Sequence, residues 1–168
     1  MHLWKKETQF GKENRIKNKR ILMVCLGNIC RSPLAQGAME FLTKKNSLKI
    51  FVDSAGTEAW HTGKSPDQRA QKVAIAKSWD ITSQKSRKIT PNDFKYFDII
   101  LAMDRNNLQD LQAACPTDLK VMIKLLLDFS PDKGKDVPDP YFSDNFEYVS
   151  NLIEKACLGF IESNKSVL

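Results

Sequence analysis

Cys25-Leu26-Gly27-Asn28-Ile29-Cys30-Arg31-Ser32-Pro33 is the stretch that decides the fold of this chain of 168 residues. An apolar run, Ile21–Val24, leads into the stretch, and helix-favouring residues, Leu34–Leu42, follow it. This order predicts a buried strand, a tight loop and then a helix. A thiol therefore stands at the end of the strand, and an arginine stands where the helix begins.

The loop between Cys25 and Arg31 has the length and composition of an oxyanion-binding site. Its five residues are enough to surround one tetrahedral oxyanion with backbone N–H groups, and the helix N-terminus adds positive partial charge. The same field makes a thiol ionise more readily than a free one, whose pKa is about 8.5. A thiolate held against a bound phosphate indicates phosphoryl transfer through a cysteinyl-phosphate.

Arg31 and Ser32 suit this chemistry, and each also has a structural interpretation. The guanidinium of Arg31 can hold two phosphate oxygens at once, and a cation at a helix N-terminus needs an anion nearby. Ser32 before Pro33 fits an N-cap followed by a proline at the first helical position. The Ser32 hydroxyl can also donate to a Cys25 thiolate, and the two roles are compatible.

The remaining loop residues have simpler interpretations. Gly27 and Asn28 are residue types that tolerate left-handed backbone conformations, which would turn the loop amides inward. Cys30 is either a resolving thiol that forms a disulfide with Cys25 or a small residue that fills the loop; we expect the redox role.

Two other kinds of site do not fit this stretch. A Walker loop needs the pattern G-x-x-x-x-G-K-[ST], which the chain does not contain. A zinc site needs further ligands, and the chain has only His2 and His61, neither at metal-binding spacing. We therefore expect neither a metal nor a cofactor.

Strands alternate with helices along the rest of the chain. The periodicity predicts strands over 20–25, 49–52 and 97–103 and helices over 34–45, from 66 onward, over 105–114 and over 144–164. For residues 120–127, the spacing of apolar residues does not distinguish a strand from a helix. This alternation implies an α/β fold, with a parallel sheet covered by helices on both faces and ligands bound beyond the carboxyl ends of the strands.

Charge is unevenly distributed along the chain. The formal net charge is +6, but the first twenty residues contribute +5 of it, with seven Lys or Arg and two Glu. We expect a disordered basic tail over 1–19 and a single domain over 20–168. Because the body is nearly neutral, we expect no nucleic-acid partner.

The cellular location is predicted from the absence of recognisable targeting and membrane-spanning segments. The tail has no apolar core typical of a secretory signal, and no segment approaches the 18 apolar residues of a membrane span. The four cysteines are more typical of free thiols than of a disulfide framework. We therefore expect a cytoplasmic protein.

The stretch Val24–Pro33 resembles the signature of the low-molecular-weight protein tyrosine phosphatases. The resemblance extends from about Arg20 to the C-terminus. Five further segments resemble the family: Asp53–Thr57, Trp60–Gly63, Ser65–Ala70, Phe97–Asp104 and Val137–Tyr141. The resemblance implies a four-stranded, flavodoxin-like sheet, with the fourth strand in the first part of residues 120–127.

The resemblance also implies the roles of the loop residues. Cys25 would be the nucleophile and Arg31 the transition-state clamp. Phosphate would be bound by the rest of the loop, at Leu26, Gly27, Asn28, Ile29, Cys30 and Ser32. The substrates would be tyrosine-phosphorylated proteins, with phosphate as product or inhibitor.

Asp139 is the candidate general acid. A phenol has a pKa of about 10, so its oxygen must be protonated as it leaves. From the residues alone, Asp139 could equally form a turn before Pro140, and Asp132, Asp136 and Asp144 lie close by in sequence. The resemblance assigns the acid role to Asp139, which would later act as base for the hydrolytic water.

Trp60, Tyr141 and Phe142 are candidates for the rim of the site, although Trp60 could instead be a core residue. A phenol ring needs an apolar wall and depth, which would exclude phosphoserine. Phosphoarginine phosphatases of this family carry Thr where this chain has Ile29, so Ile29 favours phosphotyrosine. Related arsenate reductases need two further cysteines, and residues 78–107 contain none.

Gln84 is a departure from the family pattern. Many members place a His at this position, where it helps to hold the loop asparagine. We expect Gln84 to hydrogen-bond Asn28 in its place. A phosphate-sensing or phosphotyrosine-binding module without activity is the alternative function, and the presence of Cys25, Arg31 and Asp139 together favours the enzyme.

Overall fold

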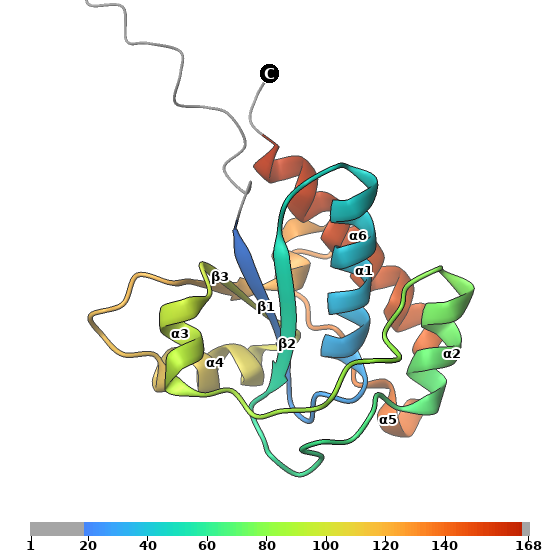
Figure 1. Ribbon diagram of the computed structural model, residues 1–168, viewed down its shortest axis with the longest axis horizontal. Coiled ribbons are helices and arrows are strands. Elements are labelled where there is room, and N and C mark those ends of the chain that lie inside the picture. The colour runs from blue at the N-terminus through green and yellow to red at the C-terminus, as the bar shows by residue number, and fades with distance from the viewer. Residues whose placement is uncertain (1–18, 166–168) are drawn as a thin grey trace, which may run out of the picture.

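A four-stranded parallel sheet forms the centre of the computed structural model, which describes residues 19–165 (Figure 1). The strands are β1 (Arg20–Cys25), β2 (Phe51–Gly56), β3 (Ile99–Ala102) and β4 (Met122–Leu125). Their order across the sheet is β2-β1-β3-β4, and every neighbouring pair is parallel. The predicted α/β fold with four parallel strands is confirmed.

Helices cover both faces of the sheet (Figure 1). They are α1 (Arg31–Lys45), α2 (Gln68–Ala76), α3 (Pro91–Tyr96), α4 (Arg105–Ala114), α5 (Pro140–Ser143) and α6 (Phe146–Asn164), with a 3₁₀ turn at Leu126–Phe129. Alternate residues of β1 point into two separate cores. Ile21 and Met23 pack with α1 and α6, whereas Leu22 and Val24 pack with α3 and α4.

Several predicted boundaries differ from the structure. Helix α1 begins at Arg31 with Cys30 as its N-cap residue, so the predicted cap at Ser32 is wrong. Strand β2 covers Phe51–Gly56 rather than 49–52, because its second half pairs with the end of β1, where Cys25 lies opposite Gly56. The last helix starts at Phe146 rather than at Asp144, which has a left-handed backbone and ends α5.

The predicted basic tail falls almost wholly outside the described residues, which begin at Lys19. Arg20 already belongs to β1, where its side chain contacts Asp98 at 3.3 Å. Within residues 19–165, no helix is both long enough and apolar enough to cross a bilayer.

Candidate active site

The site lies at the carboxyl ends of the strands, where Cys25 ends β1 and Arg31 begins α1. A cavity of about 200 Å³ opens there, and it is lined by every predicted site residue except Ser32. His61, which the sequence did not single out for the site, also lines the cavity. Cys25 is 3% exposed and Arg31 4% exposed, so the floor of the cavity is a buried sulfur beside a buried guanidinium.

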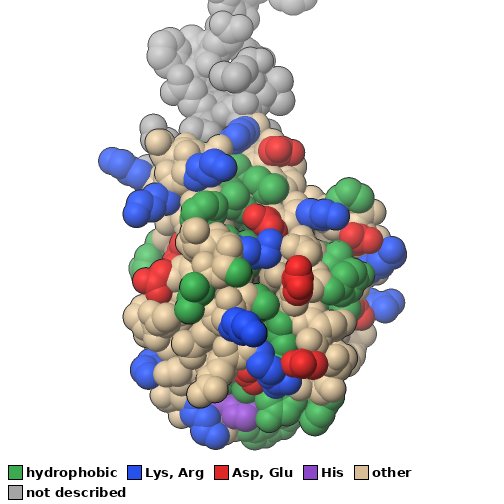
Figure 2. All heavy atoms as spheres, turned by 90° about the vertical axis from the view of Figure 1, so that its right-hand side faces the viewer, with side chains coloured by type: hydrophobic (Ala, Val, Ile, Leu, Met, Phe, Trp, Pro, Cys, Tyr) green, Lys and Arg blue, Asp and Glu red, His purple; other side chains and the backbone are tan. Residues whose placement is uncertain are grey.

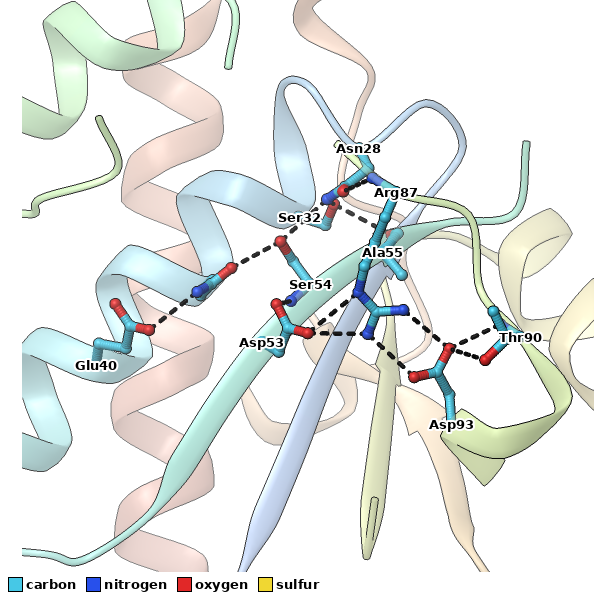
Figure 3. Close-up of polar contacts among 10 residues, drawn as sticks. Asn28, Ser32, Glu40, Asp53, Ser54, Ala55, Arg87, Thr90 and Asp93 are labelled. Atoms are coloured by element: carbon cyan, nitrogen blue, oxygen red, sulfur yellow. Dashed lines mark hydrogen bonds and ion pairs between the residues drawn. The ribbon is translucent and has the colours of Figure 1, made fainter. Parts of the chain in front are cut away.

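The backbone of the loop is held in place by the side chain of Asn28. Asn28 has a φ of 55°, the left-handed conformation that was predicted for it. Its amide oxygen accepts from Arg87 N–H at 3.0 Å, and its amide nitrogen donates to Ser32 Oγ at 2.8 Å and to Ser54 Oγ at 3.0 Å (Figure 3). These contacts stabilise a backbone conformation that is unfavourable for a residue with a Cβ.

Gly27 does not adopt the left-handed conformation predicted for it, since the positive-φ glycines of the described chain are Gly63 and Gly134. Its lack of a side chain matters for another reason. A Cβ on Gly27 would lie 3.0 Å from Cδ2 of His61. Glycine therefore lets the segment that carries Trp60 and His61 approach the loop closely.

The directions of the hydrogen bonds around Asn28 leave the hydroxyl hydrogen of Ser32 available to Cys25. A backbone N–H can only donate, so the amide oxygen of Asn28 must face Arg87 and both amide hydrogens are used on serines. Ser32 Oγ thus accepts from Asn28, and its own hydrogen is left for Cys25 Sγ at 3.0 Å or Ala55 O at 3.4 Å. Asn28 N–H lies 3.3 Å from the same sulfur, so two donors can stabilise a thiolate there.

The guanidinium of Arg31 is held by two residues that lie far from it in the sequence, Asp104 and Val137. Its Nη1 donates to Asp104 Oδ2 at 2.7 Å and to Val137 O at 3.0 Å, which leaves other N–H groups of the fork for a ligand. Burial alone lowers the pKa of Arg31, but the Cys25 sulfur and the Asp104 carboxylate outweigh it and raise the pKa. The sequence did not single out Asp104 as a site residue. Its position directly after a buried strand could have indicated it, because ligands bind beyond the carboxyl ends of such strands.

Asp104→Asn is expected to lower kcat/KM for an aryl phosphate roughly tenfold, because the Arg31 guanidinium loses a charged partner. The substitution isolates this effect, since Asp104 is also the N-cap of α4 and Asn is an equally good capping residue. Steady-state kinetics and the Tm would be measured together. An unchanged kcat/KM would show that Asp104 does not orient Arg31 for the reaction.

Asp139 combines the two roles that the sequence left open. Its Oδ1 accepts from Tyr141 N at 3.1 Å and caps α5, which is the turn interpretation. Its Oδ2 lies 3.7 Å from Arg31 Nη2, and the residue lines the cavity. The neighbouring carboxylates are engaged elsewhere: Asp136 pairs with Arg105, Asp144 with Arg69 and Asp132 with Lys135.

The rim of the cavity is aromatic and exposed. Trp60 is 66% exposed and Phe142 92% exposed, so Trp60 is not a core residue. Figure 2 shows a histidine at one end of the molecule, with hydrophobic, basic and acidic side chains around it. Arg69 supports this rim, because it donates to Tyr141 O at 3.1 Å and its guanidinium lies 5.5 Å from the centre of the Tyr141 ring.

Gln84 makes no hydrogen bond to Asn28, so the predicted hydrogen bond is wrong. Its Nε2 donates to Pro33 O at 3.3 Å, and its Oε1 is buried without a partner among the described residues. Both amide hydrogens of Asn28 are used by Ser32 and Ser54, and its amide oxygen accepts from Arg87 N–H instead.

Cys30 is buried at the start of α1, and its thiol is free, as is that of Cys25. Burial raises the pKa of the Cys30 thiol far above its ordinary value, and the charges of Asp67 and Cys25 add to the effect. Cys30 is therefore a neutral thiol near pH 7. Across residues 19–165, no three His, Cys, Asp or Glu side chains are grouped as metal ligands would be.

Peroxide is expected to inactivate the protein reversibly through these two cysteines. Peroxide would oxidise the Cys25 sulfur to a sulfenic acid. The Cys30 sulfur would then attack it to form a disulfide, while the Cys30 proton leaves with the sulfenic hydroxyl as water. Mass spectrometry after peroxide treatment should find the Cys25–Cys30 bridge, and dithiothreitol should restore activity. If a Cys30→Ala variant recovers equally well, Cys30 is not the resolving thiol.

Known proteins with the same fold carry phosphatase names. The crystal structure of a protein tyrosine phosphatase from Entamoeba histolytica has a TM-score of 0.82 and 38% sequence identity, covering 87% of this chain and 96% of that one. The crystal structure of a Drosophila arginine phosphatase has a TM-score of 0.81 and 31% identity, covering 88% of this chain and 98% of that one.

Sequence comparisons identify the family. The family model for low molecular weight phosphotyrosine protein phosphatases matches residues 20–167. The low molecular weight protein-tyrosine-phosphatase YfkJ of Bacillus subtilis is 39% identical over 140 residues, which cover 82% of this chain and 90% of that protein. The chain belongs to the low molecular weight phosphotyrosine protein phosphatase family.

Proposed function

We propose that this chain hydrolyses phosphotyrosine in proteins, and small aryl phosphates, through a cysteinyl-phosphate on Cys25. The observation that carries the proposal is a buried sulfur with two hydrogen-bond donors, beside a buried arginine, at the floor of a cavity with an aromatic rim. Family membership supports the same reaction.

The first chemical step transfers the phosphoryl group to sulfur. The Cys25 thiolate attacks phosphorus while the bond to the phenol oxygen breaks and Asp139 gives that oxygen its proton. The phosphoryl oxygens are bound by Arg31 and by the backbone N–H groups of residues 26–30, with Ser32 supporting the sulfur. This positive field comes from the protein itself, so the proposed mechanism uses no metal.

The second step regenerates the enzyme. The Asp139 carboxylate takes a proton from water, whose oxygen attacks phosphorus and displaces the Cys25 sulfur as a thiolate. Inorganic phosphate leaves, and it also acts as a competitive inhibitor because it fits the same loop. The Ser32 hydroxyl stabilises the departing thiolate as it did the attacking one.

The rim favours an aromatic substrate. The exposed rings of Trp60, Tyr141 and Phe142 provide an apolar wall for the phenol ring above the loop, and Ile29 adds an apolar side chain within the loop. Tyrosine-phosphorylated proteins are therefore the proposed partners. Residues 20–168 form the proposed catalytic domain, and the cytoplasm is its proposed location.

Substrate competition tests the proposal. In EDTA, the protein should release phosphate from a phosphotyrosine peptide much faster than from the same peptide with phosphoserine. A phosphoarginine peptide is the third arm, because one structural relative carries the name arginine phosphatase. Absence of turnover on all three would favour the phosphate-binding module, and faster phosphoarginine turnover would reject the assignment to phosphotyrosine.

A further inference from the structure

The side chain of Arg87 lies outside the cavity, and the proposed chemistry does not use it. We propose that Arg87 forms an ionic latch with Asp53 and Asp93 that positions the phosphate-binding loop for the reaction. The inference rests on the proposed function and assigns Arg87 as a positioning residue that acts through Asn28 and Ser32 on Cys25.

The latch consists of four hydrogen bonds made by one guanidinium group (Figure 3). Arg87 Nε and Nη2 donate to Asp53 Oδ2 at 3.1 and 2.9 Å, while Nη1 and Nη2 each donate at 3.0 Å to an oxygen of Asp93. Burial opposes the charge of Arg87, but Asp93 and Asp53 outweigh burial and raise the pKa of the guanidinium. The latch thus joins β2, which carries Asp53, to α3, which carries Asp93.

Both carboxylates are held independently of Arg87. Asp93 belongs to a capping box, in which its Oδ2 accepts from the N–H of Thr90 at 2.7 Å and the Thr90 hydroxyl at 3.1 Å. The other oxygen of Asp53 accepts from Ser54 N–H at 2.8 Å. The two acceptors are therefore preorganised, and the planar fork of an arginine fits between them.

The backbone of Arg87 and the neighbouring Ser86 side chain hydrogen-bond to the phosphate-binding loop. Arg87 N–H donates to Asn28 Oδ1 at 3.0 Å, and the preceding hydroxyl, Ser86 Oγ, donates to Gly27 O at 3.1 Å. On its other side Arg87 O accepts from Gly56 N–H at 2.8 Å. The residue therefore connects the loop to the sheet through its backbone and to α3 through its side chain.

This segment has little regular structure of its own to hold it. Between the end of α2 at Ala76 and the start of α3 at Pro91, its sheet pairing is a single bridge from Lys88 to Gly56. The bond from Arg87 N–H decides which way the Asn28 amide faces. That orientation makes Ser32 Oγ the acceptor from Asn28 and leaves its hydrogen available to the Cys25 sulfur at 3.0 Å, the shorter of its two possible contacts. A displaced Arg87 would release this constraint while leaving the distant core unchanged.

The test compares Asp53→Asn and Arg87→Lys with a matched ion pair elsewhere. Arg20 and Asp98 form an ion pair of the same chemistry, with side chains 39% and 28% exposed against 32% and 35% for Arg87 and Asp53. That pair lies at the amino ends of the strands, far from the loop. Asp98→Asn is therefore the control.

Both latch variants are expected to lower kcat for an aryl phosphate about tenfold with little change in KM, as small misplacements of reacting groups do. They should also move the pH profile of Cys25 alkylation by iodoacetate to higher pH, because the Ser32 hydrogen is no longer directed at the sulfur. Asp98→Asn should leave both measurements within twofold. Latch variants that lower only the Tm, or move neither measurement, would overturn the proposal.

Guanidinium rescue provides a second measurement. In Arg87→Ala, free guanidinium ions at millimolar concentration should restore part of the lost kcat, because both carboxylates remain in place to bind them. No restoration in a folded Arg87→Ala protein would argue against the latch. The alkylation profile does not depend on turnover, so it tests the latch even if the unmodified protein fails to hydrolyse aryl phosphates, which would refute the proposed function instead.

Discussion

Cys25→Ser is expected to reduce kcat for an aryl phosphate by more than about a thousandfold, roughly 4 kcal/mol in the activation barrier. A serine hydroxyl does not ionise near neutral pH, so no nucleophile of comparable strength remains. The groups that would bind phosphate are unaffected, because Arg31 is held by Asp104 and Val137 rather than by the sulfur. The variant should therefore still bind phosphate.

Two measurements separate these effects. Initial rates report turnover, and the increase of Tm with added phosphate reports binding to the folded state. Cys115→Ser is the matched control, since Cys115 is a free, partly exposed thiol at the end of α4, away from the cavity. If Cys25→Ser keeps more than a tenth of the parent kcat, Cys25 is not the nucleophile.

The central strand and its loop can be predicted from sequence because their signals are local. The run before Cys25 is buried on both faces, and its predicted bounds match β1 (Arg20–Cys25). Helix α4 (Arg105–Ala114) also has the predicted bounds, since Asp104 caps it and the chain turns at Cys115. The predicted loop residues come together around one cavity because the loop is contiguous in sequence.

The supports of the site cannot be predicted in this way, because they come from distant parts of the chain. Asp104 lies 73 residues from Arg31, and Arg87 lies 59 residues from Asn28. No periodicity or turn pattern links such pairs. The wrong expectation for Gln84 has the same origin: a resemblance indicated the position, but the partners of Asn28 were set by the packing of β2 and the segment before α3.

The second large effect is expected for Asp139→Asn. Aryl phosphates whose phenols have high pKa values should be hydrolysed roughly 10²–10⁴ times more slowly, because their oxygen leaves only when it is protonated. Substrates whose leaving group is already a stable anion should be affected much less. The rates would be measured over a series of phenols, as kcat against leaving-group pKa.

Asp136→Asn and Asp144→Asn are the controls that make this series decisive. Both residues lie in the same acidic segment, but their carboxylates are paired with Arg105 and Arg69 rather than facing the cavity. If these variants change the rate at all, they should change it equally for every phenol, whatever its pKa, because neither group delivers the proton. Should Asp139→Asn also slow every substrate by one constant factor, the residue serves only as the cap of α5. The proton donor would then have to be another group at the cavity, which is also lined by His61 and Cys30.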